Sequence, residues 1–371
     1  MKVLYVTTIG GTMRFFTQFI QELLDEGHTV DVAANETGSR IPDCYREWGC
    51  RVYPISTSRS PLNKGNLTAI KQIRKIVSEN GYDIVHCHTP IAAMCTRLAC
   101  RGVRKQGTKV FYTAHGFHFY KGAPLKNWLL YYPVEKVCAH FTDTLITINQ
   151  EDYALARKKL KAKKIEYVPG VGVDLEKFAD VPADRLEKRR EMGIPEDAVL
   201  LLSVGELNEN KNHETVIRAI AGMDAHYIIA GSGTRQAHLQ NVIDTLGMTD
   251  RVKLLGYRKD VSELYKAADL FVFPSFREGL SVSVMEAMAS GLSVACSRIR
   301  GNTDLIDENG GALFDPHSVE ECVEAIRTLL AADRATMGAY NAEKVKRFSR
   351  EPVHTQMTEL MQIQPAVLEY V

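Results

Sequence analysis

An alternation of short apolar strands with helices runs twice along this sequence, and it constrains the fold more than any other feature. The first alternation opens with an apolar run at 3–9, which is followed by Gly10, Gly11, an amphipathic helix and a second strand at 29–34. Further helices are expected near 66–79, 91–102 and 126–139, and further strands at 84–87, 109–113 and 144–148. Fully apolar strands separated by helices are typical of a parallel sheet that is covered on both faces.

The alternation pauses between residues 168 and 198, where turn-forming residues and a charged helix at 184–191 occur. It then resumes with strands at 199–204, 227–230, 252–255, 270–273 and 292–295. A chain of 371 residues is too long for one hydrophobic core. We therefore predict an α/β protein with two doubly wound domains, at 1–172 and 173–345, followed by an amphipathic segment at 346–371.

The composition excludes several classes of protein. Lys and Arg number 46 and Asp and Glu 45, so a net charge of +1 argues against nucleic acid as a partner bound through the overall field. The eight cysteines form no C-x-x-C pair, which predicts reduced thiols in the cytoplasm and no zinc site. The N-terminal run reads as a strand and not as a signal peptide, and no apolar stretch is long enough to span a bilayer. Any membrane contact, at the inner face of the cell membrane, is then expected to be peripheral.

Three loops that follow strands of the second half carry glycine and polar residues, at 205–213, 230–234 and 274–281. Ligands of open parallel sheets bind beyond the carboxyl ends of the strands, and helix N-termini at such loops suit phosphate. Lys211 adds a positive charge, so a diphosphate is the expected ligand. Each loop taken alone is equally well read as a plain turn. The G-x-G-x-x-G spacing and the Walker lysine pattern are both absent, which argues against NAD binding and ATP hydrolysis.

Two glutamates stand in the segment 273–291 with seven residues between them, Glu278 in a loop and Glu286 in the helix that follows. Glu278 is placed to reach a ligand at the mouth of the helix, and Glu286 to accept hydrogen bonds from ribose hydroxyls. From spacing alone, ordinary structural roles explain the two glutamates equally well. Glu278 would then be a first-turn charge that satisfies the helix dipole, and Glu286 a surface residue of the helix.

This segment resembles the signature of retaining glycosyltransferases of family 4, and similar motifs follow in the family's order along nearly the whole chain. They are Gly10 with Gly11, 27–30, 83–88, 113–116, 169–174, 205–213, 230–233, 255–261 and the two glutamates. The resemblance implies the GT-B fold, with two Rossmann-like domains facing a central cleft and a C-terminal helix that crosses back to the N-terminal domain. It extends to bacterial capsular and exopolysaccharide glycosyltransferases.

Carried over by position, the resemblance implies a catalytic set of His115, Glu278 and Lys211. The implied donor-binding set is Gly10, Gly11, Gly205, Glu206, Gly231, Tyr257, Arg258, Gly279, Leu280, Ser281 and Glu286. Glu206 departs from the family, which usually has an arginine there, and we expect another cation such as Arg235 or Arg258 to compensate. No metal and no cofactor are implied, and His86 and His88 are expected to be structural.

The implied activity is transfer of a hexose or N-acetylhexosamine, with retention, from a nucleoside-diphosphate sugar, by family frequency a UDP-sugar. The acceptor is expected to be a sugar or a polyprenyl-linked sugar of cell-surface polysaccharide synthesis. Lysines alternate with aromatic and aliphatic residues at 121–136, and Arg97, Arg101, Arg104 and Lys105 lie nearby in sequence. This mixture suits contact with an anionic membrane, and a core helix with solvated lysines explains it equally well. A nucleotide-sugar epimerase of the same fold and a catalytically silent nucleotide-sugar sensor are the alternatives.

Overall fold

The computed structural model describes residues 1–179 and 181–362 and divides the chain into two compact units. Unit 1 comprises residues 1–171 together with the segment that begins at Val353, and unit 2 comprises Gly172–Pro352. The sequence placed these divisions after residue 172 and at residue 346. The part of the C-terminal segment from 363 to 371 lies outside the described residues.

Unit 1 is built on a parallel sheet of seven strands in the order β3-β2-β1-β4-β5-β6-β7. The strands are β1 (Lys2–Ile9), β2 (Thr29–Asn35), β3 (Val52–Pro54), β4 (Ile84–His88), β5 (Lys109–Ala114), β6 (Thr144–Thr147) and β7 (Lys164–Tyr167). The helices are η1 (Gly10–Phe16), α1 (Thr17–Asp25), α2 (Cys44–Glu47), α3 (Gly65–Asn80), α4 (Pro90–Ala99), η2 (Val103–Gln106), α5 (Leu125–Ala139) and α6 (Gln150–Lys159).

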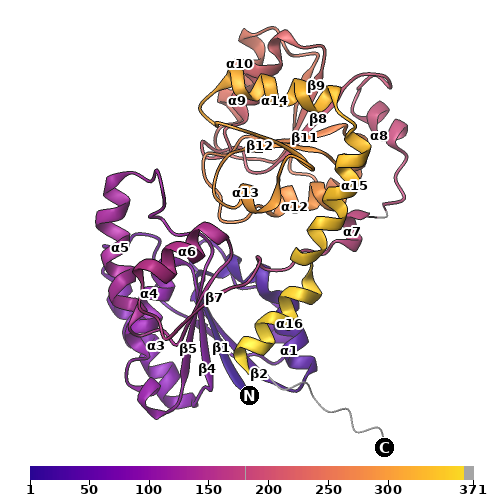
Figure 1. Ribbon diagram of the computed structural model, residues 1–371. Coiled ribbons are helices and arrows are strands. Elements are labelled where there is room, and N and C mark those ends of the chain that lie inside the picture. The colour runs from indigo at the N-terminus through magenta and orange to yellow at the C-terminus, as the bar shows by residue number, and fades with distance from the viewer. Residues whose placement is uncertain (180, 363–371) are drawn as a thin grey trace, which may run out of the picture. The chain divides into compact units, whose positions relative to one another are not determined.

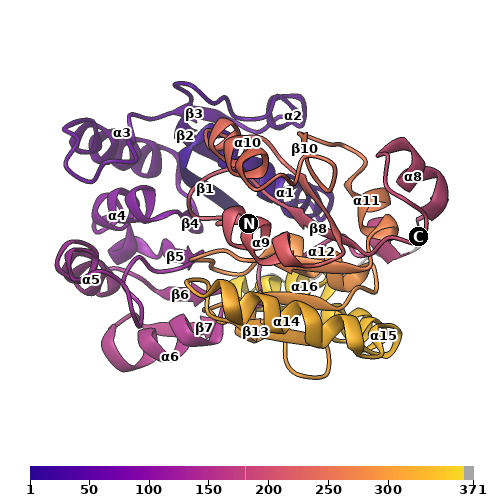
Figure 2. The same ribbon diagram turned by 90° about the horizontal axis from the view of Figure 1, so that it is seen from above.

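Both faces of the unit 1 sheet are buried. Successive residues of a strand point to opposite sides, so each strand contributes side chains to two cores. Leu4 and Val6 of β1 belong to the core beneath α3, α4, α5 and α6, whereas Val3 and Tyr5 belong to the core beneath η1, α1 and α2. Figure 2 shows α3, α4 and α5 side by side in one layer. On the other face the C-terminal helix α16 (Arg350–Met361) adds Val353, Met357 and Met361 to the core. The predicted return of the C-terminal helix to the first domain is thereby confirmed (Figure 1).

Unit 2 has a parallel sheet of six strands in the order β10-β9-β8-β11-β12-β13. The strands are β8 (Leu200–Val204), β9 (His226–Ala230), β10 (Val252–Gly256), β11 (Leu270–Phe273), β12 (Val294–Ser297) and β13 (Gly311–Phe314). The helices are α7 (Glu176–Ala179), α8 (Arg185–Glu191), α9 (His213–Ala219), η3 (Ile220–Gly222), α10 (Gln236–Thr245), α11 (Val261–Ala267), α12 (Val282–Ala289), α13 (Asn302–Leu305), α14 (Val319–Ala331), α15 (Arg334–Lys344) and η4 (Val345–Phe348).

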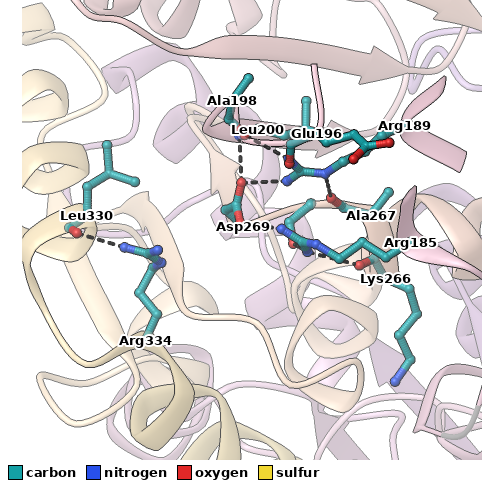
Figure 3. Close-up of polar contacts among 11 residues, drawn as sticks. Arg185, Arg189, Glu196, Ala198, Leu200, Lys266, Ala267, Asp269, Leu330 and Arg334 are labelled. Carbon is teal, nitrogen blue, oxygen red and sulfur yellow. Dashed lines mark hydrogen bonds and ion pairs between the residues drawn. The ribbon is translucent and has the colours of Figure 1, made fainter. Parts of the chain in front are cut away.

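The buried side chain of Arg189 links helix α8 to the end of the unit 2 sheet (Figure 3). The guanidinium of Arg189 donates to the carbonyl oxygens of Glu196, Ala198 and Ala267 at 2.8 to 3.0 Å and pairs with Asp269 at 2.7 Å. The same Asp269 carboxylate accepts the backbone N–H of Leu200, the first residue of β8. The charged helix predicted at 184–191 is therefore confirmed, and one of its charges is buried.

Neither disulfides nor membrane spans occur in the described part of the chain. All eight cysteines are free thiols, and seven of them are buried. Among the described residues, no helix combines the length and the hydropathy that crossing a bilayer requires.

Candidate active site

The strand order of unit 2 places a topological switch point beside β8. This strand pairs with β9 on one side and with β11 on the other, so the loops after β8 and β11 diverge at the carboxyl edge of the sheet. Ligands of doubly wound folds bind at such a crevice. Of the predicted site residues, Lys211 follows β8 and Glu278 follows β11.

Lys211 and Glu278 meet at this switch point. Lys211 Nζ lies 2.8 Å from Glu278 Oε1, and both side chains are mostly buried, at 19% and 15% exposure. The ammonium also lies 4.7 Å from the centre of the Phe273 ring. The structure thus brings two of the three predicted catalytic residues into direct contact, although they are far apart in sequence.

The two loops that carry this pair are hydrogen-bonded to each other. Phe276 N–H donates to the carbonyl of Asn210 at 2.8 Å, and the Asn210 side-chain amide donates to the carbonyl of Arg277 at 2.9 Å. Asn212 adopts a left-handed conformation, with φ of 52°, and its amide donates to the carbonyl of Pro274 at 3.1 Å. These bonds fix the position of Lys211 relative to Glu278.

The predicted glycines after β8 and β9 allow the two loops to touch. A Cβ atom on Gly231 would lie 1.8 Å from the carbonyl oxygen of Gly205, and one on Gly233 would lie 2.4 Å from that of Leu207. The Gly205 N–H donates to Ala230 O at 3.0 Å. Gly205 and Gly231 therefore bring the β8 loop, which carries Lys211, against the next strand.

Helix α12 begins directly after the loop that carries Glu278. Ser281 is buried and is its N-cap, since its hydroxyl accepts the N–H of Val284 at 3.4 Å. Gly279 and Leu280 are half-buried just ahead of this cap. The first N–H groups of a helix have no partner within it and favour an anion. An array of N–H donors and one ammonium group thus lies at this edge of unit 2.

Glu286 lies inside α12 and has an unusual acidity. Burial raises the pKa of its carboxyl to about 7, although the Tyr265 hydroxyl and the charge of Lys177 oppose the shift. The Tyr265 hydroxyl donates to Glu286 Oε2 at 3.0 Å. This carboxyl is therefore divided between its neutral and ionised forms near neutral pH.

Three further predicted donor-binding residues follow β8 and β10. Glu206 is exposed, and it forms no ion pair with any residue that the structure describes. Tyr257 is 75% exposed just beyond β10. Arg258 pairs with Asp260 and, at 2.8 Å, with Glu191. Two carboxylates already neutralise Arg258, which argues against its expected role as the replacement cation.

A cation that the sequence analysis missed lies closer to the pair. Arg300 follows β12, is only 6% exposed, and donates from Nε to the carbonyl oxygen of Glu278 at 3.1 Å. The other predicted replacement, Arg235, lies 3.6 Å from the Glu214 carboxylate. A signal for Arg300 was present in the sequence, since it stands in the turn that follows the strand next to β11.

The third predicted catalytic residue, His115, belongs to unit 1. It follows β5, and its Nε2 atom lies 3.1 Å from Nδ1 of His88 at the end of β4. His88 in turn packs between Tyr5 and Phe16, with ring centres 5.5 and 4.1 Å away. Burial lowers the pKa of His115 to about 4, so the imidazole is neutral at pH 7.

His86 and His88 are buried and form an uncharged cluster with the half-buried His115. Burial lowers the pKa of His86 to about 3, and burial with two imidazole neighbours lowers that of His88 well below its ordinary value. His86 Nε2 lies 2.8 Å from the Thr113 hydroxyl. Among the described residues, no group of three or more His, Cys, Asp or Glu side chains has a geometry suited to holding a metal ion.

Gly10 and Gly11, predicted to bind the donor, pack inside unit 1. A Cβ atom on Gly10 would lie 2.4 Å from the carbonyl oxygen of Ser39, and one on Gly11 would lie 2.3 Å from the Ser39 hydroxyl. The loop that contains Ser39 thus explains why both positions lack a side chain.

Both halves of the chain match family models. Residues 9–177 match the model described as Glycosyltransferase Family 4, and residues 184–346 match that described as Glycosyl transferases group 1. A relative from Bacillus subtilis (strain 168), named putative glycosyltransferase EpsD, is 38% identical over 83% of this chain and 82% of its own length. The chain belongs to the family 4 glycosyltransferases. A relative from Escherichia coli, named UDP-Gal:alpha-D-GlcNAc-diphosphoundecaprenol alpha-1,3-galactosyltransferase, is 28% identical over 86% of this chain and 84% of its own.

Solved structures of low sequence identity share the fold. Sucrose-phosphate synthase from Thermosynechococcus elongatus aligns over 98% of both chains with a TM-score of 0.80 and 21% identity. HepE from Anabaena, solved in complex with UDP, aligns over 98% of this chain and all of its own with a TM-score of 0.81 and 20% identity. The predicted GT-B fold of this glycosyltransferase is therefore confirmed.

Proposed function

We propose that this glycosyltransferase moves a hexose or N-acetylhexosamine, with retention, from a UDP-sugar to a sugar or polyprenyl-linked sugar of cell-surface polysaccharide synthesis. The contact between Lys211 and Glu278 at the switch point carries the proposal. A mostly buried ammonium at the sheet edge where helix α12 begins is suited to a diphosphate, and a neighbouring carboxylate is suited to sugar hydroxyls.

In the proposed reaction, the bond between the anomeric carbon and the diphosphate oxygen breaks while the acceptor oxygen bonds to the same face of that carbon. The acceptor hydroxyl proton passes to the departing phosphate oxygen. Lys211 and the N–H groups of Gly279, Leu280 and Ser281 stabilise the charge on the diphosphate. Glu278 positions the donor sugar through its hydroxyls, and no metal or other cofactor is assigned a step.

The remaining donor contacts are assigned by position. Glu286 accepts the ribose hydroxyls, Tyr257 contacts the nucleotide, and Gly205 and Gly231 admit the diphosphate. Glu206, which replaces the usual cation, points its charge to solvent. His115 acts on the sugar as a neutral imidazole that donates or accepts one hydrogen bond.

The choice of donor and acceptor class rests on the named relatives. The name of the Escherichia coli relative gives UDP-Gal as donor and a diphosphoundecaprenol-linked sugar as acceptor. HepE was solved with UDP and shares the fold. We extend to this chain the UDP-sugar class and the lipid-linked class, without a particular sugar.

A panel of UDP- and GDP-sugars tests the proposal by nucleotide release, first alone and then with diphospholipid-linked sugars. We expect a UDP-sugar to give release that the acceptor accelerates and that a chelator leaves unchanged. Lys211→Ala should lower the rate by about 100-fold or more, the loss typical of one preorganised donor. Lys346→Ala, which alters a lysine of unit 2 that is 66% exposed, is the matched control.

The anomeric configuration of the product, read by NMR, tests the stereochemistry separately. An inverted product would exclude same-face attack. Interconversion of the free UDP-sugar without any transfer would instead identify an epimerase.

A further inference from the structure

Helix α5 of unit 1 carries an apolar outer face that the protein core does not use. Its inner side buries Glu135, Cys138 and Ala139. On its outer side Leu125 and Leu129 are 72% and 71% exposed. Three more large apolar side chains of the same helix are exposed, Leu130, Val134 and Val137. Contiguous apolar surface on a folded protein marks a site of contact with another molecule or with lipid.

The apolar surface continues beyond α5 to the loop before α3. A small pocket joins the two elements, lined among others by Pro61, Leu130 and Val134. Leu62, next to Pro61, is 85% exposed. We name the exposed side chains of Leu62, Leu125, Leu129, Leu130, Val134 and Val137 the α5 surface. The same pocket is lined by Phe117 and His118, two and three residues after His115, so the α5 surface reaches the edge of unit 1 that holds His115.

The layer that contains this surface is strongly basic, although the whole chain is nearly neutral. Segments 58–80, 89–107 and 119–141, which include α3, α4 and α5, contain twelve Lys and Arg but only two carboxylates, Glu79 and Glu135. Glu135 is buried and paired with Arg97, which is 1% exposed. The expectation that Arg97 belongs to a basic surface is therefore wrong. Of the remaining cations, Lys75 lies 4.0 Å from Glu79, and the others greatly outnumber the carboxylates of these segments.

A basic hollow of about 690 Å³ lies in the same layer, near the C-terminal ends of α4 and α5. Its charged and aromatic lining residues are Arg74, Arg101, Arg104, Lys105, His140 and Phe141. Arg104 pairs with Asp143 at 2.8 Å, and the Arg101 guanidinium lies 4.6 Å from the centre of the Phe141 ring. Arg74, Arg101 and Lys105 form no ion pair with the described residues. The hollow therefore has the charge and the size to take an anionic headgroup.

We propose that the α3–α4–α5 layer binds an anionic membrane, with the α5 surface entering the lipid interface and the basic hollow taking phosphate headgroups. Apolar side chains flanked by lysines are typical of interfacial helices, because the ammonium groups of Lys126 and Lys136 reach the headgroups while the leucines are buried. A second copy of this chain is a poorer partner, because a symmetric contact would bring two basic layers together. The inference rests on the proposed function, since it explains how a lipid-linked acceptor meets the edge that holds His115.

Vesicle sedimentation tests the proposal with the full chain, using phosphatidylcholine vesicles with and without phosphatidylglycerol. We expect binding at low salt only to the anionic vesicles, and dissociation as the salt rises. Replacing both Leu125 and Leu129 by serine should weaken binding by about tenfold or more, because two largely exposed leucines lose their burial in lipid. Leu186→Ser is the matched control, since Leu186 is 39% exposed on α8 of unit 2.

Lys126→Glu with Lys136→Glu should weaken binding to anionic vesicles by about tenfold or more as well, whereas Lys346→Glu should not. Far-UV circular dichroism confirms that each variant is folded. Failure to bind anionic vesicles at low salt would overturn the proposal, as would equal binding by all variants. A serine variant that loses a dimer in sedimentation velocity, with no vesicle binding by the parent chain, would assign the α5 surface to self-association. Nucleotide release from a UDP-sugar without vesicles reports the proposed donor chemistry independently, so the two failures remain distinguishable.

Discussion

At the scale of single residues, the pair formed by Lys211 and Glu278 prepares the site for an anion. The Glu278 carboxylate lies 2.8 Å from the Lys211 ammonium, at the edge of unit 2 where helix α12 begins. A diphosphate that enters would take over the ammonium and release Glu278 to bind hydroxyl groups. Because both side chains are already fixed, little reorganisation accompanies this exchange.

Glu286 gives the donor affinity a pH dependence. Burial raises the pKa of its carboxyl to about 7, and ribose hydroxyls donate hydrogen bonds to the ionised form. Binding of a UDP-sugar, whose diphosphate keeps its charge in this range, should therefore release a proton and become about tenfold tighter from pH 6 to pH 8. Titration calorimetry at several pH values measures this.

The Glu286→Gln variant is the control, since its amide does not titrate. It should bind with an affinity that is flat over the same range, and a persistent pH dependence in this variant would assign the proton to another group. Folding stability has the opposite trend. The folded pKa lies above the ordinary value of 4.5, so the contribution of Glu286 falls as pH rises from 4.5 to about 7.

Sequence patterns located the site residues better than they located their partners. Glu278 and Lys211 stand after strands, and strand order makes them neighbours. The sequence predicts Arg258 as a replacement cation and places Arg97 near a basic segment, but they lie beside Glu191 and Glu135, which are distant in sequence, and Arg258 also pairs with Asp260. Ion pairing of this kind depends on how helices pack, which no local spacing encodes.

At the scale of secondary structure elements, the central strands could be predicted and three edge strands could not. β3 and β7 are the outermost strands of the unit 1 sheet, and β13 is an outermost strand in unit 2. They are three to four residues long and include half-buried positions. Since an edge strand is covered less completely, it lacks the continuous apolar run that identified β1, β4, β8 and β11.

The close contact between the β8 and β9 loops predicts that a single methyl group disrupts donor binding. In Gly231→Ala the new Cβ atom would lie 1.8 Å from the Gly205 carbonyl oxygen, which must then move together with the loop that carries Lys211. We expect affinity for a UDP-sugar to fall by about tenfold or more. Gly222→Ala, where nothing lies within 4 Å of the new atom, should bind normally in the same calorimetric experiment.

The anchoring of α8 predicts a large loss of stability from one arginine and almost none from its neighbour. Arg189→Ala leaves Asp269 and three carbonyl oxygens without their buried donor, which should lower the free energy of unfolding of unit 2 by about 3 to 5 kcal/mol (Figure 3). Arg190 is 61% exposed and pairs with Glu196. Its replacement by alanine should lower the free energy of unfolding by less than about 1 kcal/mol. Urea unfolding followed by circular dichroism measures both, and similar losses would contradict the assigned role of Arg189.

At the scale of the whole molecule, the two units have similar sheets but bury different titratable groups. Unit 1 contains four histidines with lowered pKa values, His28, His86, His88 and His115. Unit 2 contains two such histidines, His213, whose pKa burial lowers to about 4, and His226, together with Glu286, whose pKa is raised to about 7. Their responses to acid therefore differ in sign and in size.

These differences predict that acid unfolds unit 1 before unit 2. A histidine with a lowered folded pKa binds its proton only when unfolded, so stability is lost as pH falls from 6.5 towards the folded value. Unit 1 incurs this loss at four sites, His28, His86, His88 and His115. In unit 2 the losses at His213 and His226 are partly offset by Glu286, whose protonation favours the folded state. Between about pH 6.5 and 5 the carboxylates whose pKa values are lowered, such as Asp143 in unit 1 and Asp260 in unit 2, stay ionised and contribute little to the difference.

Tryptophan fluorescence separates the two units, because Trp48 and Trp128, the two tryptophans of the chain, both belong to unit 1. On acidification we expect the tryptophan fluorescence to change at a higher pH than that at which the last far-UV circular dichroism of the chain is lost. In hydrogen exchange, the amides of β4 and β5 should exchange before those of β8 and β11. His86→Phe removes one buried imidazole and keeps an aromatic ring between Tyr5 and Phe111, so it should move the fluorescence midpoint to lower pH. Simultaneous loss of both units, or an unchanged midpoint in this variant, would show that the buried histidines do not set the acid limit of unit 1.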